Sequence, residues 1–140
     1  MLKEYFSILS EGSRETGFDE KVLSEEAGTA LEKLISGDHK YLADTINHAE
    51  LTPEIRRDTA VNGQHPYAVI VTSSDARVPP EHIFSAGIGD LFVIRNAGNL
   101  IGSFDLESVE YAVEHLGAKL VVIMGHTHCG AVAAAMEGDS

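Results

Sequence analysis

Three short apolar segments, separated by turn residues and by one helical segment, constrain the fold of this chain more than any other feature. The segments are rich in Val, Ile and Phe and are bounded by Gly, Pro, Ser or Asp, which is typical of buried β-strands. They cover residues 67–72, 91–95 and 119–124. Between the second and the third, residues 103–117 carry apolar side chains at helical spacing, and we expect Ser103 to cap this helix and Gly117 to end it.

The strand–helix–strand order predicts an α/β fold with a parallel-sheet core of βαβ units. Near-continuous apolar strands indicate a sheet that is covered on both faces, with functional groups at the carboxyl ends of the strands. The residues before these strands have helical spacing instead. We therefore expect one domain (residues 1–140) that comprises a helical arm (1–62) and a βαβ core (63–140).

Two helices are expected in the part of the arm nearest to the core. The first follows Ser24, which precedes two glutamates, and is expected to stop at Gly37. The second is expected to begin at Thr52, because a threonine caps well and the proline that follows it suits the first helical position.

The charge of the chain argues against polyanionic partners. Twenty-two acidic residues against ten basic ones give a formal net charge of −12, which repels nucleic acids and anionic membrane surfaces. We expect neither as a partner. Locally placed arginines could still bind a small anion such as bicarbonate.

The distribution of apolar residues and of cysteine favours a soluble, cytoplasmic protein. No apolar run approaches the ~20 residues that a membrane span needs. The first residues place charges such as Lys3, Glu4 and Glu11 among their apolar positions, unlike the core of a secretory signal. The single cysteine, Cys129, excludes a disulfide within the chain and is free for metal binding or chemistry.

Chemically active residues follow two of the expected strands. Asp75 and Arg77 follow the first strand, and His126 and Cys129 follow the third and precede a small-residue helix over residues 130–135. A helix N-terminus favours a thiolate or an anion in front of it. The spacing His-x-x-Cys alone is more often that of a structural histidine and a buried free cysteine. Together with the carboxylate and the guanidinium at a neighbouring strand end, it predicts a metal site.

At this point the sequence resembles a known family, the β-class carbonic anhydrases. In that family the first strand ends in Cys-x-Asp-x-Arg and a later strand ends in His-x-x-Cys. The resemblance covers roughly residues 30–138. Its blocks are residues 37–41, 63–66, 75–81, 89–99, 108–112 and 125–131.

The resemblance implies a zinc site and the residues that build it. His126 and Cys129 would be zinc ligands. Asp75 would be either a further ligand in a closed form or, in an open form, a hydrogen-bond acceptor for zinc-bound hydroxide that Arg77 holds in place. Zinc lowers the pKa of bound water to about 7, which suits the hydration of carbon dioxide near neutral pH.

The resemblance also implies a substrate pocket. Gln64 aligns with a glutamine that donates to the substrate oxygen, Phe92 and Tyr111 align with aromatic residues of the pocket wall, and Gly98 is assigned to the same pocket. Ordinary core packing is the alternative role for the two aromatic residues. Family members form dimers with active sites at the interface, so we expect a homodimer or a higher even-numbered homo-oligomer.

Two features differ from the pattern of the family. Ser73 occupies the position of the first zinc-binding cysteine, and a neutral hydroxyl is a poorer zinc ligand than a thiolate. His128 is a nearby nitrogen, although its spacing favours a solvent-facing side chain. Family members usually continue beyond the position of Ser140, so we expect this chain to be short at its C-terminus.

The function expected from these residues is zinc-dependent, reversible hydration of carbon dioxide to bicarbonate, with the site impaired by Ser73. One alternative is a non-catalytic, metal-poor paralogue that binds bicarbonate or a partner subunit. Another is hydrolysis of a sulfur analogue such as carbon disulfide, which needs zinc equally. A Rossmann-type nucleotide site is disfavoured, because no strand is followed by Gly-x-Gly-x-x-Gly.

Overall fold

The computed structural model describes residues 24–44, 46–47 and 49–138. The first part of the expected helical arm therefore lies outside the described residues. Along the chain the elements are α2 (Glu25–Asp44), α3 (Pro53–Asn62), β1 (Ala68–Ser73), α4 (Pro80–Ile83), β2 (Leu91–Asn96), α5 (Ser103–Glu114), β3 (Val121–Met124) and α6 (Gly130–Glu137).

The three strands form one parallel sheet with β1 in the centre, in the order β2-β1-β3. Ala68 is paired with Leu91 at the start of β1, and Ser73 is paired with Asn96 at its end. Every residue of β1 is buried, whereas Val121 at the edge of the sheet is 40% exposed. The expected parallel sheet and its βαβ connection are confirmed, and all three carboxyl ends lie at the same edge.

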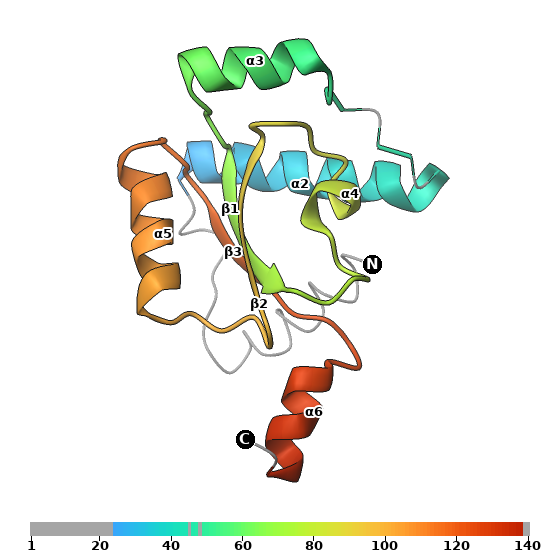
Figure 1. The fold of residues 1–140 in the computed structure, drawn as a ribbon. Helices are drawn as coiled ribbons and strands as arrows, with labels where there is room; N and C mark the ends of the chain where they lie inside the picture. Colours follow the sequence, from blue (N-terminus) through green and yellow to red (C-terminus); the bar gives the residue numbers. More distant parts are fainter. Residues whose placement is uncertain (1–23, 45, 48, 139–140) are drawn as a thin grey trace.

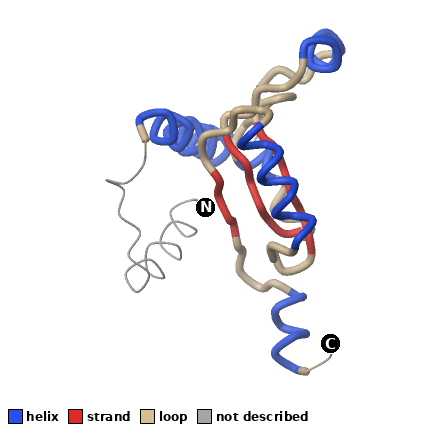
Figure 2. The backbone as a smooth tube through the Cα atoms, turned by 90° about the vertical axis from the view of Figure 1, so that its left-hand side faces the viewer, coloured by secondary structure: helices blue, strands red, loops and turns tan. Residues whose placement is uncertain are grey.

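Helices cover both faces of the central strand, as Figures 1 and 2 show. On one face α2 and α4 contribute Leu34 and Ile83 to a core that includes Ile70. On the other face Ala112 of α5 packs in a second core with Val71. Alternate residues of β1 thus point to opposite layers, as the pleat of a strand requires.

Local capping signals correctly predicted two helix starts and misplaced a third. The Ser24 hydroxyl accepts a hydrogen bond of 3.1 Å from the amide of Ala27. Thr52 caps α3 in the same way through the amide of Ile55. The expected cap at Ser103 is wrong, because Gly102 is the N-cap of α5 and its amide donates to the carboxylate of the third helical residue.

The expected stop at Gly37 is also wrong, because α2 continues through it to Asp44. A Cβ atom at this position would lie 1.8 Å from the carbonyl oxygen of Phe84, directly after α4. The side chain of Ser85 donates a hydrogen bond of 3.0 Å to the Gly37 carbonyl. The glycine therefore permits two backbone segments to approach closely and does not end the helix.

The remaining elements differ from the expected ones mainly at their ends. β3 begins two residues later than expected, and the short helix α4 had no clear signal in the sequence. The expected helix after Cys129 is present as α6, which has no buried residue and projects from the carboxyl edge of the sheet (Figure 1). None of the helices in the described part of the chain combines the length and apolar character needed to cross a membrane.

Candidate metal centre and active site

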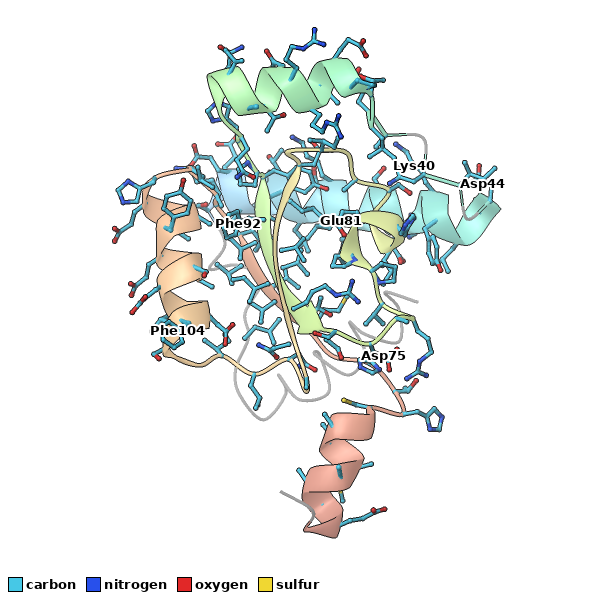
Figure 3. The ribbon with its side chains drawn as sticks, viewed as in Figure 1. Lys40, Asp44, Asp75, Glu81, Phe92 and Phe104 are labelled. Carbon is cyan, nitrogen blue, oxygen red and sulfur yellow. The ribbon has the colours of Figure 1, made fainter. Side chains whose placement is uncertain are left out.

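The carboxyl ends of β1 and β3 lie side by side, and the chemical groups expected from the sequence follow both of them. The hydroxyl of Thr72, next to the last residue of β1, donates a hydrogen bond of 3.1 Å to the carbonyl of Met124, the last residue of β3. Asp75 lies just beyond this junction (Figure 3). The parallel pairing of the strands thus brings together two segments that are far apart in the sequence.

Asp75 and Arg77 form a bidentate ion pair. One carboxylate oxygen accepts from Arg77 Nε at 3.0 Å and from the Arg77 backbone amide at 2.9 Å. The other accepts from Nη2 at 2.9 Å. These hydrogen bonds, chiefly those from the side chain, hold the pKa of Asp75 well below its usual range. Asp75 is therefore ionised at neutral pH and fixed in orientation.

Arg77 also contacts the turn that follows β3. Its Nη2 atom donates to the carbonyl oxygens of Thr127, at 3.3 Å, and His128, at 3.1 Å. The same atom lies 3.5 Å from Nδ1 of His126. His128 has a positive φ of 54°, a backbone conformation that non-glycine residues rarely adopt. One guanidinium thus links the carboxylate after β1 to the backbone that carries His126.

The environment of His126 suits a metal ligand. Its Nδ1 atom lies 3.0 Å from the carbonyl oxygen of Thr127, to which it donates a hydrogen bond in the tautomer that carries the proton on Nδ1. The other ring nitrogen, Nε2, is buried and has no hydrogen-bond partner within the described residues. In that tautomer Nε2 is available to a metal, and an unpaired Nε2 on a ring oriented by a backbone carbonyl is the usual arrangement of a zinc-binding histidine.

The other expected ligands do not form a complete metal site with His126 in the described part of the chain. Cys129 is a free, half-buried thiol at the N-cap of α6. Ser73 is buried, and its hydroxyl accepts a hydrogen bond of 3.1 Å from the amide of Asp75. No group of three His, Cys, Asp or Glu side chains that could hold a metal ion occurs within the described residues. The carboxylate of Asp75 is engaged by Arg77, which corresponds to the arrangement expected for the open form.

The residue types present nevertheless fit zinc in part. Imidazole nitrogen and thiolate sulfur are the ligands that zinc prefers in proteins, and here both follow the same strand. The position that would supply a second sulfur carries the oxygen of Ser73. The site thus offers one soft ligand where a tight structural zinc site usually has two or more.

Arg95 contacts the site although sequence reasoning gave it no role. Its Nε donates to the carbonyl of Ser73 at 2.8 Å, and its Nη2 donates to the carbonyl of Asp75 at 2.7 Å. Arg95 falls within a block of residues that resembles the carbonic anhydrases, and this was the only signal for it. Sequence spacing alone gives no reason for a β2 residue to contact the turn after β1.

Three of the expected pocket residues lie away from the metal-ligand turn. Phe92 is near the start of β2, well away from Asp75, which follows the carboxyl end of β1 (Figure 3). Tyr111 of α5 packs against it, with ring centroids 6.1 Å apart. Gln64 precedes β1, on the amino side of the sheet. These three residues do not meet Asp75 within one chain.

Gly98, in contrast, lies at the carboxyl edge of the sheet. It follows β2 with a φ of +84°, and a Cβ atom there would lie 3.7 Å from Ala131 Cβ in α6. A groove lined by Lys33, Lys40 and Tyr67 is on the amino side of the sheet, away from this edge. The site residues that one chain supplies thus lie along the carboxyl edge of the sheet, without the other expected pocket residues around them.

Comparisons with known proteins agree with this geometry. The profile of a family described as Carbonic anhydrase matches residues 68–140. Carbonic anhydrase 2 of Mycobacterium tuberculosis is 43% identical over 107 residues, which cover 76% of this chain and 51% of the relative. The chain therefore spans about half the length of this relative.

Solved structures give the same result for the fold. The β-carbonic anhydrase CcaA matches with a TM-score of 0.57 and 32% identity, over 76% of this chain and 53% of that chain. A structure of tetrameric β-carbonic anhydrases from Sordaria macrospora matches with a TM-score of 0.53 and 30% identity, over 78% of this chain and 52% of that chain. Because the family profile covers more than half of the residues and the fold matches solved members, the chain belongs to the β-class carbonic anhydrase family.

Proposed function

We propose that this protein catalyses the zinc-dependent, reversible hydration of carbon dioxide to bicarbonate, with release of a proton. The observation that supports the proposal most strongly is the Asp75–Arg77 ion pair beside the turn of His126, at the carboxyl edge of a sheet of this family. A carboxylate, a fixed guanidinium and an unpaired imidazole nitrogen at one edge suit hydration better than they suit core packing.

The zinc ligands that this chain can supply are His126 through Nε2, Cys129 through Sγ and, after movement away from Arg77, Asp75. When bound, zinc lowers the pKa of a water to about 7 and so provides hydroxide near neutral pH. Ser73 can contribute only a neutral hydroxyl oxygen at the remaining position. We therefore propose a zinc affinity below that of a site with two thiolates.

The Asp75–Arg77 pair would orient the reacting groups. An ionised carboxylate cannot donate a hydrogen bond, so Asp75 accepts one from the attacking oxygen and directs its lone pair toward the carbon of carbon dioxide. Arg77 keeps that carboxylate ionised and fixed through two side-chain hydrogen bonds. The guanidinium also places positive charge where the bicarbonate anion forms.

We propose that the active form is a homodimer or a higher even-numbered homo-oligomer. Gln64, Phe92 and Tyr111 do not reach the site of their own chain, so a second copy would have to bring them there. The described surface has large apolar side chains that a partner could cover, among them Phe104 at 81% exposed and Tyr111 at 48%. The relatives from Sordaria macrospora are described as tetrameric. The single cysteine suits a cytoplasmic location, which we also propose.

Ser73 also favours a second candidate function. A site that cannot retain zinc could still bind bicarbonate through Arg77 and serve as a metal-poor paralogue. This reading shares the fold and the ion pair with the first but requires no bound metal. Measured zinc content therefore separates the two.

The test is to purify the protein without added metal and to measure zinc per chain together with carbon dioxide hydration by stopped-flow indicator assay. We expect hydration above the buffer rate that a chelator removes and added zinc restores. The Arg77→Ala variant, loaded with zinc in the same way, serves as the control for the contribution of the pair. Full zinc occupancy without hydration would contradict the proposed activity, and bicarbonate binding without zinc would favour the second function.

A further inference from the structure

Arg95 connects β2 to the turn that carries two of the expected site residues. Its guanidinium donates through Nε to the carbonyl of Ser73, at 2.8 Å, and through Nη2 to the carbonyl of Asp75, at 2.7 Å. Both hydrogen bonds are short and charge-assisted, because the donor is a cation. A single planar group therefore fixes two carbonyls that flank Ser74.

Three backbone amides of this turn also donate hydrogen bonds. The amide of Ser74 donates to the Asn96 carbonyl at 2.8 Å, and the amide of Asp75 donates to the Ser73 hydroxyl at 3.1 Å. The amide of Arg77 donates to the Asp75 carboxylate at 2.9 Å. Several hydrogen bonds thus constrain the backbone between the end of β1 and the ion pair, and the partners from outside the turn, Arg95 and Asn96, belong to β2.

Resting on the function proposed above, we propose that Arg95 is a positioning residue that holds the Ser73–Asp75 backbone where the Asp75 carboxylate pairs with Arg77 beside His126. Arg95 acts through the backbone, because its two hydrogen bonds go to main-chain carbonyls. Its influence on the site is therefore indirect, through the place and direction of Asp75.

The stability of the fold depends little on the side chain of Arg95. β1 is paired along its length with β2 and β3 and is buried between two apolar cores, to which Arg95 contributes no side chain. Loss of the guanidinium leaves these contacts in place and removes two hydrogen bonds at the end of the sheet. A lysine has one nitrogen in place of a planar fork, so it cannot reproduce both hydrogen bonds in the same geometry.

The experiment follows the Arg77 Nε–H group by NMR in the full chain without added metal. In the parent protein this proton is hydrogen-bonded to Asp75, so its signal is displaced from that of a free arginine and exchanges slowly with water. We expect Arg95→Lys and Arg95→Met to speed its exchange about tenfold or more, since one charge-assisted hydrogen bond would be lost for much of the time. The Arg77→Lys variant, which lacks the signal, provides the assignment.

Thermal unfolding of the same variants separates positioning from stabilisation. We expect both Arg95 variants to remain folded, and the control Arg56→Lys, on the exposed helix α3, to leave the Arg77 signal unchanged. An unaltered Arg77 signal in the Arg95 variants would overturn the proposal. So would loss of the folded state in both, because Arg95 would then be a structural residue. The readout needs neither zinc nor turnover, so a protein inactive in hydration still tests Arg95 independently of the proposed function.

Discussion

Nη2 of Arg77 donates a hydrogen bond of 3.1 Å to the carbonyl oxygen of His128, which connects the segment after β1 to the turn after β3. The same guanidinium also donates hydrogen bonds to the carboxylate of Asp75. Arg77 thus holds both halves of the candidate site at once, and its replacement should affect both the carboxylate and the metal-ligand turn.

Arg77→Ala should lower carbon dioxide hydration by about 10- to 100-fold, the usual cost of losing a group that orients a metal site. Arg77 is 55% exposed, and the apolar core does not depend on it, so circular dichroism should show the parent fold. The measurement is the hydration rate at equal zinc loading. Arg56→Ala on α3 is the matched control and should retain the parent rate. Equal rates in the parent and in Arg77→Ala would show that Asp75 and Arg77 form only a surface ion pair with no role in hydration.

The lowered pKa of Asp75 predicts the direction of a pH effect on stability. A carboxyl whose folded pKa lies below its ordinary value of 3.8 contributes stability that is present above that pH and lost as the pH falls toward the folded value. Asp75→Asn should therefore be less stable than the parent at neutral pH, and the two unfolding midpoints should converge in acid. Thermal unfolding from about pH 6 down to about pH 2 measures this, with the difference between the two proteins shrinking below about pH 4.

Arg77→Ala gives a second check on the cause of that pKa shift. Because the lowering hydrogen bonds come from Arg77, this variant should lose the same acid-dependent part of the stability as Asp75→Asn. A difference between parent and variants that stays constant over the whole pH range would contradict this linkage.

Ser73→Cys should raise zinc affinity by about 100-fold, since one additional thiolate among four ligands is worth ~3 kcal/mol of binding free energy. The side chain is buried at the end of β1, and the exchange replaces one oxygen by sulfur, so packing should change little. Chelator competition and metal analysis measure the gain. Ser74→Cys is the control, because this neighbouring residue is exposed. No gain at position 73 would mean that it is not a ligand position.

Gly37→Ala should destabilise the protein by about 3 kcal/mol, because its new methyl group would collide with backbone that cannot move freely. The added Cβ would lie 1.8 Å from the Phe84 carbonyl oxygen. Gly28→Ala, in the same helix, has no atom within 4 Å of the added Cβ and should stabilise by about 0.5–1 kcal/mol. Urea unfolding of the two variants measures both signs. Equal effects would rule out the close approach.

The sequence by itself determined the elements whose signals lie within a few residues. The cap at Thr52 and the proline after it predicted the start of α3, because a capping hydrogen bond spans only three residues. Short apolar runs predicted the parallel strands, since burial on both faces demands them. The sequence also placed Asp75 and His126 at strand ends, and parallel pairing alone then brings such ends to one edge.

The tertiary structure decided what depends on contacts between distant segments. Gly37 looks like a helix stop locally, but Phe84 approaches it from another part of the chain and makes it a packing site. Arg95 acquires a role only because β2 lies beside β1, and Phe92 is carried away from Asp75 by the same pairing. The physical reason is that a side chain's partners depend on the register and layering of the whole sheet, which no single stretch of sequence specifies.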